Sequence, residues 1–108
     1  MDKNENWLKI AADITEISFA ENNVASFTIA EKTICLVKIG DHLKAFSASC
    51  PHAGGNLCEG FVDKKENIIC PVHGYRFSMN TGRDSGGEGY FLKIYKIEQR
   101  ADGLFIRL

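Results

Sequence analysis

Two short stretches of this 108-residue chain place a cysteine close to a histidine: Cys50-Pro51-His52 and Cys70-Pro71-Val72-His73. Thiolates and imidazoles are both good ligands for transition metals, and each stretch contains a proline, which stiffens the turn. Two cysteines and two histidines suit either a tetrahedral zinc site or a 2Fe–2S cluster in which two histidines hold one iron. The spacing favours the cluster, because structural zinc sites typically pair cysteine with cysteine and histidine with histidine over a few residues.

The residues around both stretches resemble the Rieske family of iron–sulfur proteins. A glycine-rich step and an acidic-glycine step follow the first stretch, and the second leads into a Phe and a Thr-Gly turn, in the segments Ala53-Gly54-Gly55, Leu57-Cys58-Glu59-Gly60, Ile69, Gly74, Phe77 and Thr81-Gly82. This resemblance covers roughly the middle third of the chain, from Cys50 to about Gly82. It implies that Cys50 and Cys70 hold one iron of a single 2Fe–2S cluster as thiolates. His52 and His73 would hold the other iron through neutral ring nitrogens.

Two departures from the high-potential members of that family concern the reduction potential. Those relatives carry an extra cysteine in each ligand loop, and the two form a disulfide; here Gly55 and Val72 take these places. They also carry a serine and a tyrosine whose hydroxyls donate to sulfur, where this chain has Tyr75 and Phe77. Fewer donors stabilise the reduced cluster less. We therefore expect a potential near the low end of the Rieske range, on the order of −150 mV.

Composition predicts one soluble globular domain over residues 1–108, with 44% hydrophobic and 25% charged residues. The net charge of −1 gives no basic field for nucleic acid. The polar start of the chain has no apolar stretch of membrane-spanning length, which favours the cytoplasm. Cys35 and Cys58 are left over once two cysteines bind the cluster. We expect Cys35 to be a small core residue and Cys58 a packed thiol in a reducing compartment, with a redox-sensitive thiol as the alternative for Cys58.

Short runs rich in β-branched and aromatic residues predict an all-β fold. The expected strands are 7–11, 24–30, 33–39, 43–47, 67–69, 75–79, 91–99 and 104–108, with 16–23 irregular or briefly helical. One face of the second run carries Ala25, Phe27 and Ile29, and one side of the last carries Leu104, Ile106 and Leu108. The resemblance implies the Rieske fold, a β-sandwich or partial barrel base. A small cluster-binding subdomain, about residues 49–86, would be inserted between its strands.

The segment Ser85-Gly86-Gly87-Glu88-Gly89 falls where the family usually has a proline-containing loop that covers the cluster. One interpretation is a flexible cover that lets a partner approach the metal. The other is a plain surface loop that is rich in glycine because it turns tightly. The missing proline is expected to loosen the loop under either interpretation.

Missing features narrow the function. Once His52 and His73 bind the cluster only His42 remains, which we expect to be an exposed loop residue, so the two-histidine iron triad of an oxygenase cannot form. The chain also has no GxGxxG dinucleotide motif. The resemblance then implies an electron-transfer protein rather than an enzyme, a monomer that takes electrons from a reductase and passes them to a terminal oxygenase through short-lived contacts. The alternatives are the small subunit of an assimilatory nitrite reductase and a zinc-stabilised structural module.

Overall fold

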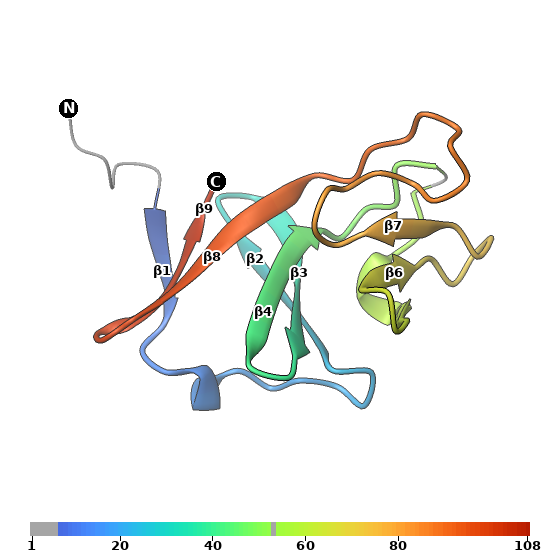
Figure 1. Ribbon diagram of the computed structural model, residues 1–108. Coiled ribbons are helices and arrows are strands. Elements are labelled where there is room, and N and C mark those ends of the chain that lie inside the picture. Colours follow the sequence, from blue (N-terminus) through green and yellow to red (C-terminus); the bar gives the residue numbers. More distant parts are fainter. Residues whose placement is uncertain (1–6, 53) are drawn as a thin grey trace.

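The regular secondary structure of the computed structural model, which describes residues 7–52 and 54–108, consists mainly of antiparallel strands. Two single-turn 3₁₀ helices interrupt them (Figure 1). The elements are, in order, β1 (Trp7–Ala11), η1 (Ile14–Glu16), β2 (Val24–Ile29), β3 (Lys32–Ile39), β4 (His42–Ser47), η2 (Leu57–Glu59), β5 (Phe61–Val62), β6 (Asn67–Ile69), β7 (Arg76–Ser78), β8 (Ile94–Arg100) and β9 (Gly103–Arg107).

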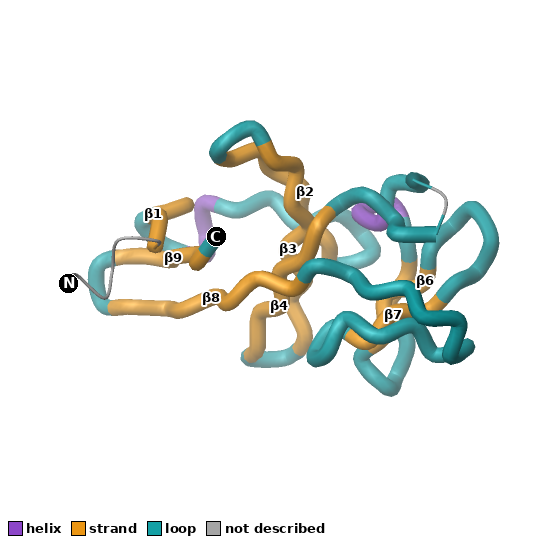
Figure 2. Tube along the Cα trace, turned by 90° about the horizontal axis from the view of Figure 1, so that it is seen from above, coloured by secondary structure: helices purple, strands orange, loops and turns teal. Residues whose placement is uncertain are grey.

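The strands form a large sheet and a small one. The large sheet has six strands in the order β1-β9-β8-β4-β3-β2 and curls into a half-barrel, and the small one has the order β5-β6-β7. The small sheet lies in the chain between β4 and β8, so the predicted all-β base with an inserted subdomain is confirmed. Both views place β6 and β7 at the end of the molecule away from β1 and β9 (Figures 1 and 2).

Eight of the nine strands in the described part of the chain were predicted to within a few residues, and β5 was not predicted. Among the predicted strands, the largest difference is at the start of β8. We expected that strand to begin at Phe91, whereas β8 begins at Ile94. Phe91 forms only an isolated bridge with Arg83 and its side chain is exposed, so it belongs to the loop that precedes the strand.

β3 is buried on both faces, and it therefore connects the two halves of the core. Its residues 34–37 are all fully buried. Because successive side chains of a strand point to opposite faces, Ile34 and Leu36 join the cluster inside the curled sheet, together with Leu104 and Ile106. The predicted apolar faces of the second and last strands, with Ala25, Phe27, Ile29 and Leu108, belong to this same cluster.

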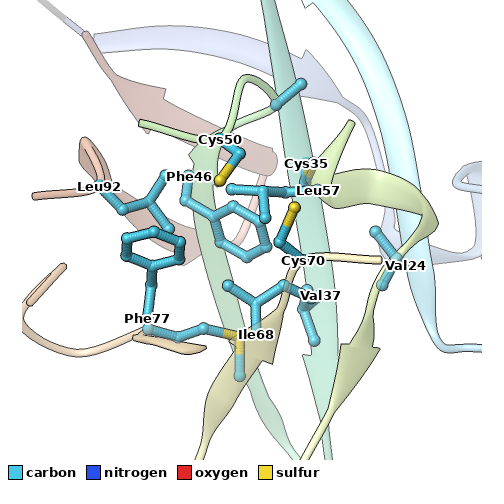
Figure 3. Close-up of a cluster of buried hydrophobic side chains, with 12 residues drawn as sticks. Val24, Cys35, Val37, Phe46, Cys50, Leu57, Ile68, Cys70, Phe77 and Leu92 are labelled. Carbon is cyan, nitrogen blue, oxygen red and sulfur yellow. The ribbon is translucent and has the colours of Figure 1, made fainter. Parts of the chain in front are cut away.

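The opposite face of β3 packs against the cluster-binding subdomain. There Cys35 and Val37 join a second buried cluster, whose other members are Val24, Phe46, Ala48, Cys50, Leu57, Ile68, Cys70, Phe77, Met79 and Leu92. Figure 3 shows Cys50 and Cys70 among Phe46, Leu57, Ile68 and Phe77. Both cysteines of the predicted metal site are therefore held by apolar, well-packed surroundings.

Candidate metal centre

The first ligand loop connects β4 to η2 and closes on itself through the backbone. The Cys50 N–H donates to the Gly55 carbonyl oxygen at 2.8 Å, and the Gly54 N–H donates back to the Cys50 carbonyl oxygen at 2.8 Å. Gly54 has a φ of 74°, which costs glycine far less than any residue with a Cβ. A bridge between Ser49 and Asn56 fixes the two ends of the loop.

The second ligand loop connects β6 to β7 and repeats the same pattern. The Cys70 N–H donates to the Tyr75 carbonyl oxygen at 2.8 Å, and the Gly74 N–H donates to the Cys70 carbonyl oxygen at 3.0 Å. Gly74 has a φ of 73°, almost the value of its counterpart in the first loop. In both loops a glycine four residues after the cysteine therefore makes the turn that returns the chain past the histidine.

The two loops meet face to face at Gly55. A Cβ added there would lie 2.6 Å from Val72 Cγ2 and 3.1 Å from Cys70 Sγ, so glycine is what permits this close approach. On the other side of the loops, the ring centroids of His52 and His73 are 5.1 Å apart. The structure thus brings all four predicted ligands together, although they come from stretches about twenty residues apart.

The burial of these side chains differs in a way that suits a metal centre at the protein surface. Cys50 and Cys70 are 2% and 1% exposed and neither is part of a disulfide. The ring of His52 is half-buried, whereas that of His73 is exposed. Two buried sulfurs therefore lie towards the core, and the histidines lie towards solvent.

One buried nitrogen of His52 tests whether a cluster fits. Nδ1 of His52 is buried and has no hydrogen-bond partner among the described residues. A buried polar atom without a partner is costly unless something else satisfies it, and coordination to iron would do so. Soft thiolates opposite imidazoles are also the donor set of a 2Fe–2S centre with unequal irons. The residues present fit the cluster.

A single metal ion makes a different geometric demand. Among the residues that the structure describes, no three His, Cys, Asp or Glu side chains meet closely enough to share one ion. In a 2Fe–2S cluster each iron takes only two protein ligands, and bridging sulfides separate the two pairs.

An aromatic side chain that the sequence analysis did not assign to the site covers His52. The ring of Tyr75 stacks on the imidazole of His52, with centroids 3.8 Å apart and planes inclined by 11°. Tyr90 meets the same imidazole edge-on at 5.4 Å. In the sequence, the position of Tyr75 two residues after His73 could have indicated this contact. The backbone closure of the second loop brings that residue towards the first loop.

The third loop, residues 84–91, reaches the site through Tyr75. The Tyr75 hydroxyl donates to the Glu88 carboxylate at 3.1 Å, which raises the pKa of Tyr75 because the carboxylate stabilises the protonated phenol. Tyr90, in the same loop, also contacts the Tyr75 ring, with centroids 5.9 Å apart. The loop therefore has specific contacts with the ligand region, although it lacks the proline that the family usually has there.

Asp84 anchors this loop from inside. Its side chain is 2% exposed, and its carboxylate accepts from the Glu88 N–H at 3.2 Å and the Tyr90 N–H at 2.9 Å. Burial by itself would raise the pKa of Asp84, but hydrogen bonds from these N–H groups and from those of Gly86 and Gly87 outweigh burial and hold that pKa below its ordinary value. An aspartate before a Gly-rich segment commonly bonds the backbone just ahead of it, and this was the signal in the sequence.

Replacing Asp84 with asparagine is expected to lower the Tm at pH 7, because an amide NH₂ would then face a backbone N–H. A depressed pKa means that the carboxylate stabilises the fold above its ordinary pKa and that this contribution is lost as the pH falls through the folded-state value. The Tm difference between wild type and Asp84→Asn should therefore shrink below about pH 4. Thermal unfolding at several pH values measures it, and a difference that grows as the pH falls would contradict this assignment.

His42 lies away from the metal centre. It is exposed and pairs with Ile39 across the turn between β3 and β4. The expected exposure is confirmed, although His42 is the first residue of β4 rather than a loop residue.

The expected core position of Cys35 is confirmed, because its side chain is fully buried, but the expectation that Cys58 is a thiol is wrong. Cys35 and Cys58 form a disulfide, with a Cα–Cα distance of 5.3 Å, instead of two separate thiols. Cys35 is buried on the face of β3 that η2 covers, so the partly buried Cys58 reaches it directly. Which face of the strand the subdomain covers depends on contacts distant in sequence, and a local pattern does not contain them.

Comparison with known proteins identifies the family. The Rieske 2Fe–2S domain family matches residues 6–88. The ferredoxin component of the naphthalene 1,2-dioxygenase system of Pseudomonas aeruginosa is 32% identical over 79 residues, which cover 73% of this chain and 72% of that protein. This chain therefore belongs to the Rieske 2Fe–2S family, and among its members it is similar to the ferredoxin components of oxygenase systems.

Solved structures agree on the fold. The ferredoxin of carbazole 1,9a-dioxygenase from Nocardioides aromaticivorans IC177 superposes with a TM-score of 0.80 at 20% identity, covering 95% of this chain and 98% of that one. A ferredoxin and oxygenase complex of carbazole 1,9a-dioxygenase gives 0.76 at 23% identity, covering 96% and 94%. A putative nitrite reductase small subunit from Mycobacterium tuberculosis gives 0.77 at 13% identity, covering 94% and 92%.

The protein thus carries a 2Fe–2S cluster and is an electron-transfer component rather than an enzyme by itself. Across the described part of the chain, no helix has the length and apolar character needed to cross a membrane.

Proposed function

We propose that this protein passes single electrons from a reductase to a terminal oxygenase, with Cys50 and Cys70 on one iron and His52 and His73 on the other. The observation that carries the ligand assignment is the convergence of these residues, with two buried thiols and a buried His52 Nδ1 that lacks a partner among the described residues. The cluster supplies the one-electron chemistry. The protein holds it with its histidine side exposed, where a partner can approach.

The second ligand loop supports contact with a partner at that side. Residues 71–74 are all exposed, and Val72 leaves 53% of its surface open to solvent. Electron carriers need short tunnelling distances and weak interfaces, and a small exposed loop bearing a ligand histidine provides both. The similarity to ferredoxin components of dioxygenase systems supports an oxygenase as the acceptor.

The contacts of Tyr75 and Phe77 support the low potential expected from the sequence. The Tyr75 hydroxyl is bound to Glu88, so it is not directed at a cluster sulfur, and Phe77 is fully buried and has no hydroxyl. Glu88 also adds a carboxylate near the histidine side, where negative charge disfavours a further electron. Both effects favour the oxidised cluster.

We expect protein-film voltammetry to give a midpoint on the order of −150 mV, well below that of the high-potential Rieske proteins. A midpoint clearly above 0 mV would contradict this reading of the Tyr75 and Phe77 positions. The same experiment checks the ligand class, because an all-cysteine cluster would lie near −400 mV.

The nitrite reductase alternative has weaker support, because the similarity to small subunits of that enzyme lies in the fold alone, at low identity. A carrier should run as a monomer in size-exclusion chromatography and should bind an oxygenase only transiently. Stable co-elution with a large nitrite reductase subunit would favour the alternative. A colourless protein containing one zinc per chain would favour the structural module.

The proposal treats residues 1–108 as one domain, which the radius of gyration of 13.6 Å supports, since about 13 Å is usual for a domain of 100 residues. It also places the protein in the cytoplasm, with its donor and acceptor. Subcellular fractionation followed by immunodetection tests that placement.

A further inference from the structure

The Cys35–Cys58 disulfide joins the two parts of the molecule. Cys35 lies in the middle of β3, within the six-stranded base, and Cys58 lies in η2, within the cluster-binding subdomain. Cys35 belongs to the buried cluster that contains Cys50 and Cys70 (Figure 3). Cys58 packs against that cluster. The bond therefore connects the support of the metal site to the sheet beneath it.

Non-covalent contacts fix η2 to both ligand loops. The Leu57 N–H donates to the carbonyl oxygen of Ala48, two residues before Cys50, at 2.7 Å. At the other end of η2, a Cβ added to Gly60 would lie 2.2 Å from the carbonyl oxygen of Ile69, the residue before Cys70. A displacement of η2 would therefore disturb the backbone just before both ligand cysteines.

Asn22 also connects η2 to the base, through hydrogen bonds. Its side-chain amide donates to the carbonyl oxygens of Cys58 at 3.1 Å and Gly60 at 2.8 Å. These bonds are partly buried and can be exchanged for bonds to water. The disulfide is the one link among these that water cannot replace.

We propose that the Cys35–Cys58 disulfide is a redox-responsive clamp: the intact bond makes the protein retain its 2Fe–2S cluster, and cleavage by a dithiol speeds cluster loss. The proposal depends on the presence of the cluster but not on which proteins donate or accept its electron. It therefore goes beyond the carrier function and can fail without affecting it.

The cleavage is a two-electron exchange. A thiolate of the dithiol attacks Cys58 Sγ, the Cys35–Cys58 bond breaks, and Cys35 leaves as a thiolate that takes up a proton. The second thiol of the reductant then attacks the mixed disulfide and releases Cys58, so the dithiol becomes a cyclic disulfide. Attack at Cys58 is favoured because that residue is partly buried, whereas Cys35 is fully buried. Dithiol proteins of the cytoplasm are reductants of this class.

The first measurement establishes the bond in the purified holoprotein. Unfolding in guanidinium chloride at neutral pH, with an iron chelator and excess N-ethylmaleimide present, should add two labels per chain, on Cys50 and Cys70, and four after prior reduction. Intact-mass spectrometry counts them. Four labels without reduction would overturn the proposal.

The second measurement follows the visible absorbance of the holoprotein in the presence of an iron chelator, with and without dithiothreitol. Wild type should lose its cluster on the order of tenfold faster once the bond is reduced, because the cross-link no longer limits local opening. The variant Cys35→Ala/Cys58→Ala should lose its cluster at the faster rate whether or not dithiothreitol is present. This variant also controls for iron binding by dithiothreitol itself.

Two results would overturn the proposal at this stage. One is an unchanged rate in wild type after reduction, and the other is an equal acceleration of wild type and variant. If the double variant does not accumulate as holoprotein, Cys58→Ala leaves Cys35 as a buried thiol and serves the same comparison. The reduction potential of the cluster and electron delivery to an oxygenase are measured separately, so failure of the carrier function would be distinguishable.

Discussion

Replacing either His52 or His73 with alanine is expected to abolish the visible absorbance of the cluster and to reduce the bound iron to near zero. Each histidine is proposed to supply one of only two protein ligands to its iron, and alanine has no group that replaces it. A second observation supports the prediction for His52. Its Nδ1 is buried and has no hydrogen-bond partner among the described residues, so the proposed iron would satisfy it. Absorbance spectra and iron and sulfide analysis of anaerobically purified protein measure the effect.

His42→Ala is the matched control, since it removes the remaining histidine of the chain at an exposed position at the start of β4. It should keep full absorbance and two irons per chain. The far-UV circular dichroism of all three variants should remain that of a β protein, because the cluster of Leu104, Ile106 and their neighbours inside the curled sheet does not involve the ligand loops. Loss of colour in the His42 variant to the same degree would show that the ligand assignment is wrong.

Phe77→Ala is expected to destabilise the fold strongly. Phe77 is fully buried and lies in the apolar cluster that also holds Cys50 and Cys70. Truncating a buried phenylalanine typically costs about 3–5 kcal/mol, from lost burial and from the cavity that remains. A loss of that size should move the midpoint of guanidinium unfolding down by about 1 M and should also weaken cluster retention.

Phe61→Ala provides the control for this prediction in the same three-stranded sheet. Phe61 lies in β5 and leaves 62% of its surface exposed, so its loss should change stability by no more than about 0.5 kcal/mol. Unfolding is followed by circular dichroism and cluster absorbance in parallel. Equal shifts in the two variants would mean that Phe77 does not support the site as described.

Local patterns predicted most of the fold. Alternating apolar residues marked Val24–Ile29 and Gly103–Arg107 because every second side chain of a strand faces the core, and that rule needs no distant information. The proposed metal centre could also be located from sequence, through the resemblance to the Rieske family, because each proposed ligand pair lies within a single short loop that contains a glycine and a proline.

Features that depend on long-range contacts could not be predicted in this way. Cys35 lies between Ile34 and Leu36 in a strand buried on both faces, so periodicity does not say which side meets Cys58. The bond between Tyr75 and Glu88 likewise requires the third loop to return over the second. The anchoring role of Asp84 was not predicted either, although its place before a glycine-rich segment was a local signal for it.

The repeated backbone closure of the two ligand loops has a consequence for how iron and sulfide enter the protein. Each loop is completed by hydrogen bonds between residues only four or five positions apart. We therefore expect the polypeptide backbone to hold these closures before iron and sulfide bind. The ligand loops would then lose little conformational entropy when the cluster is inserted.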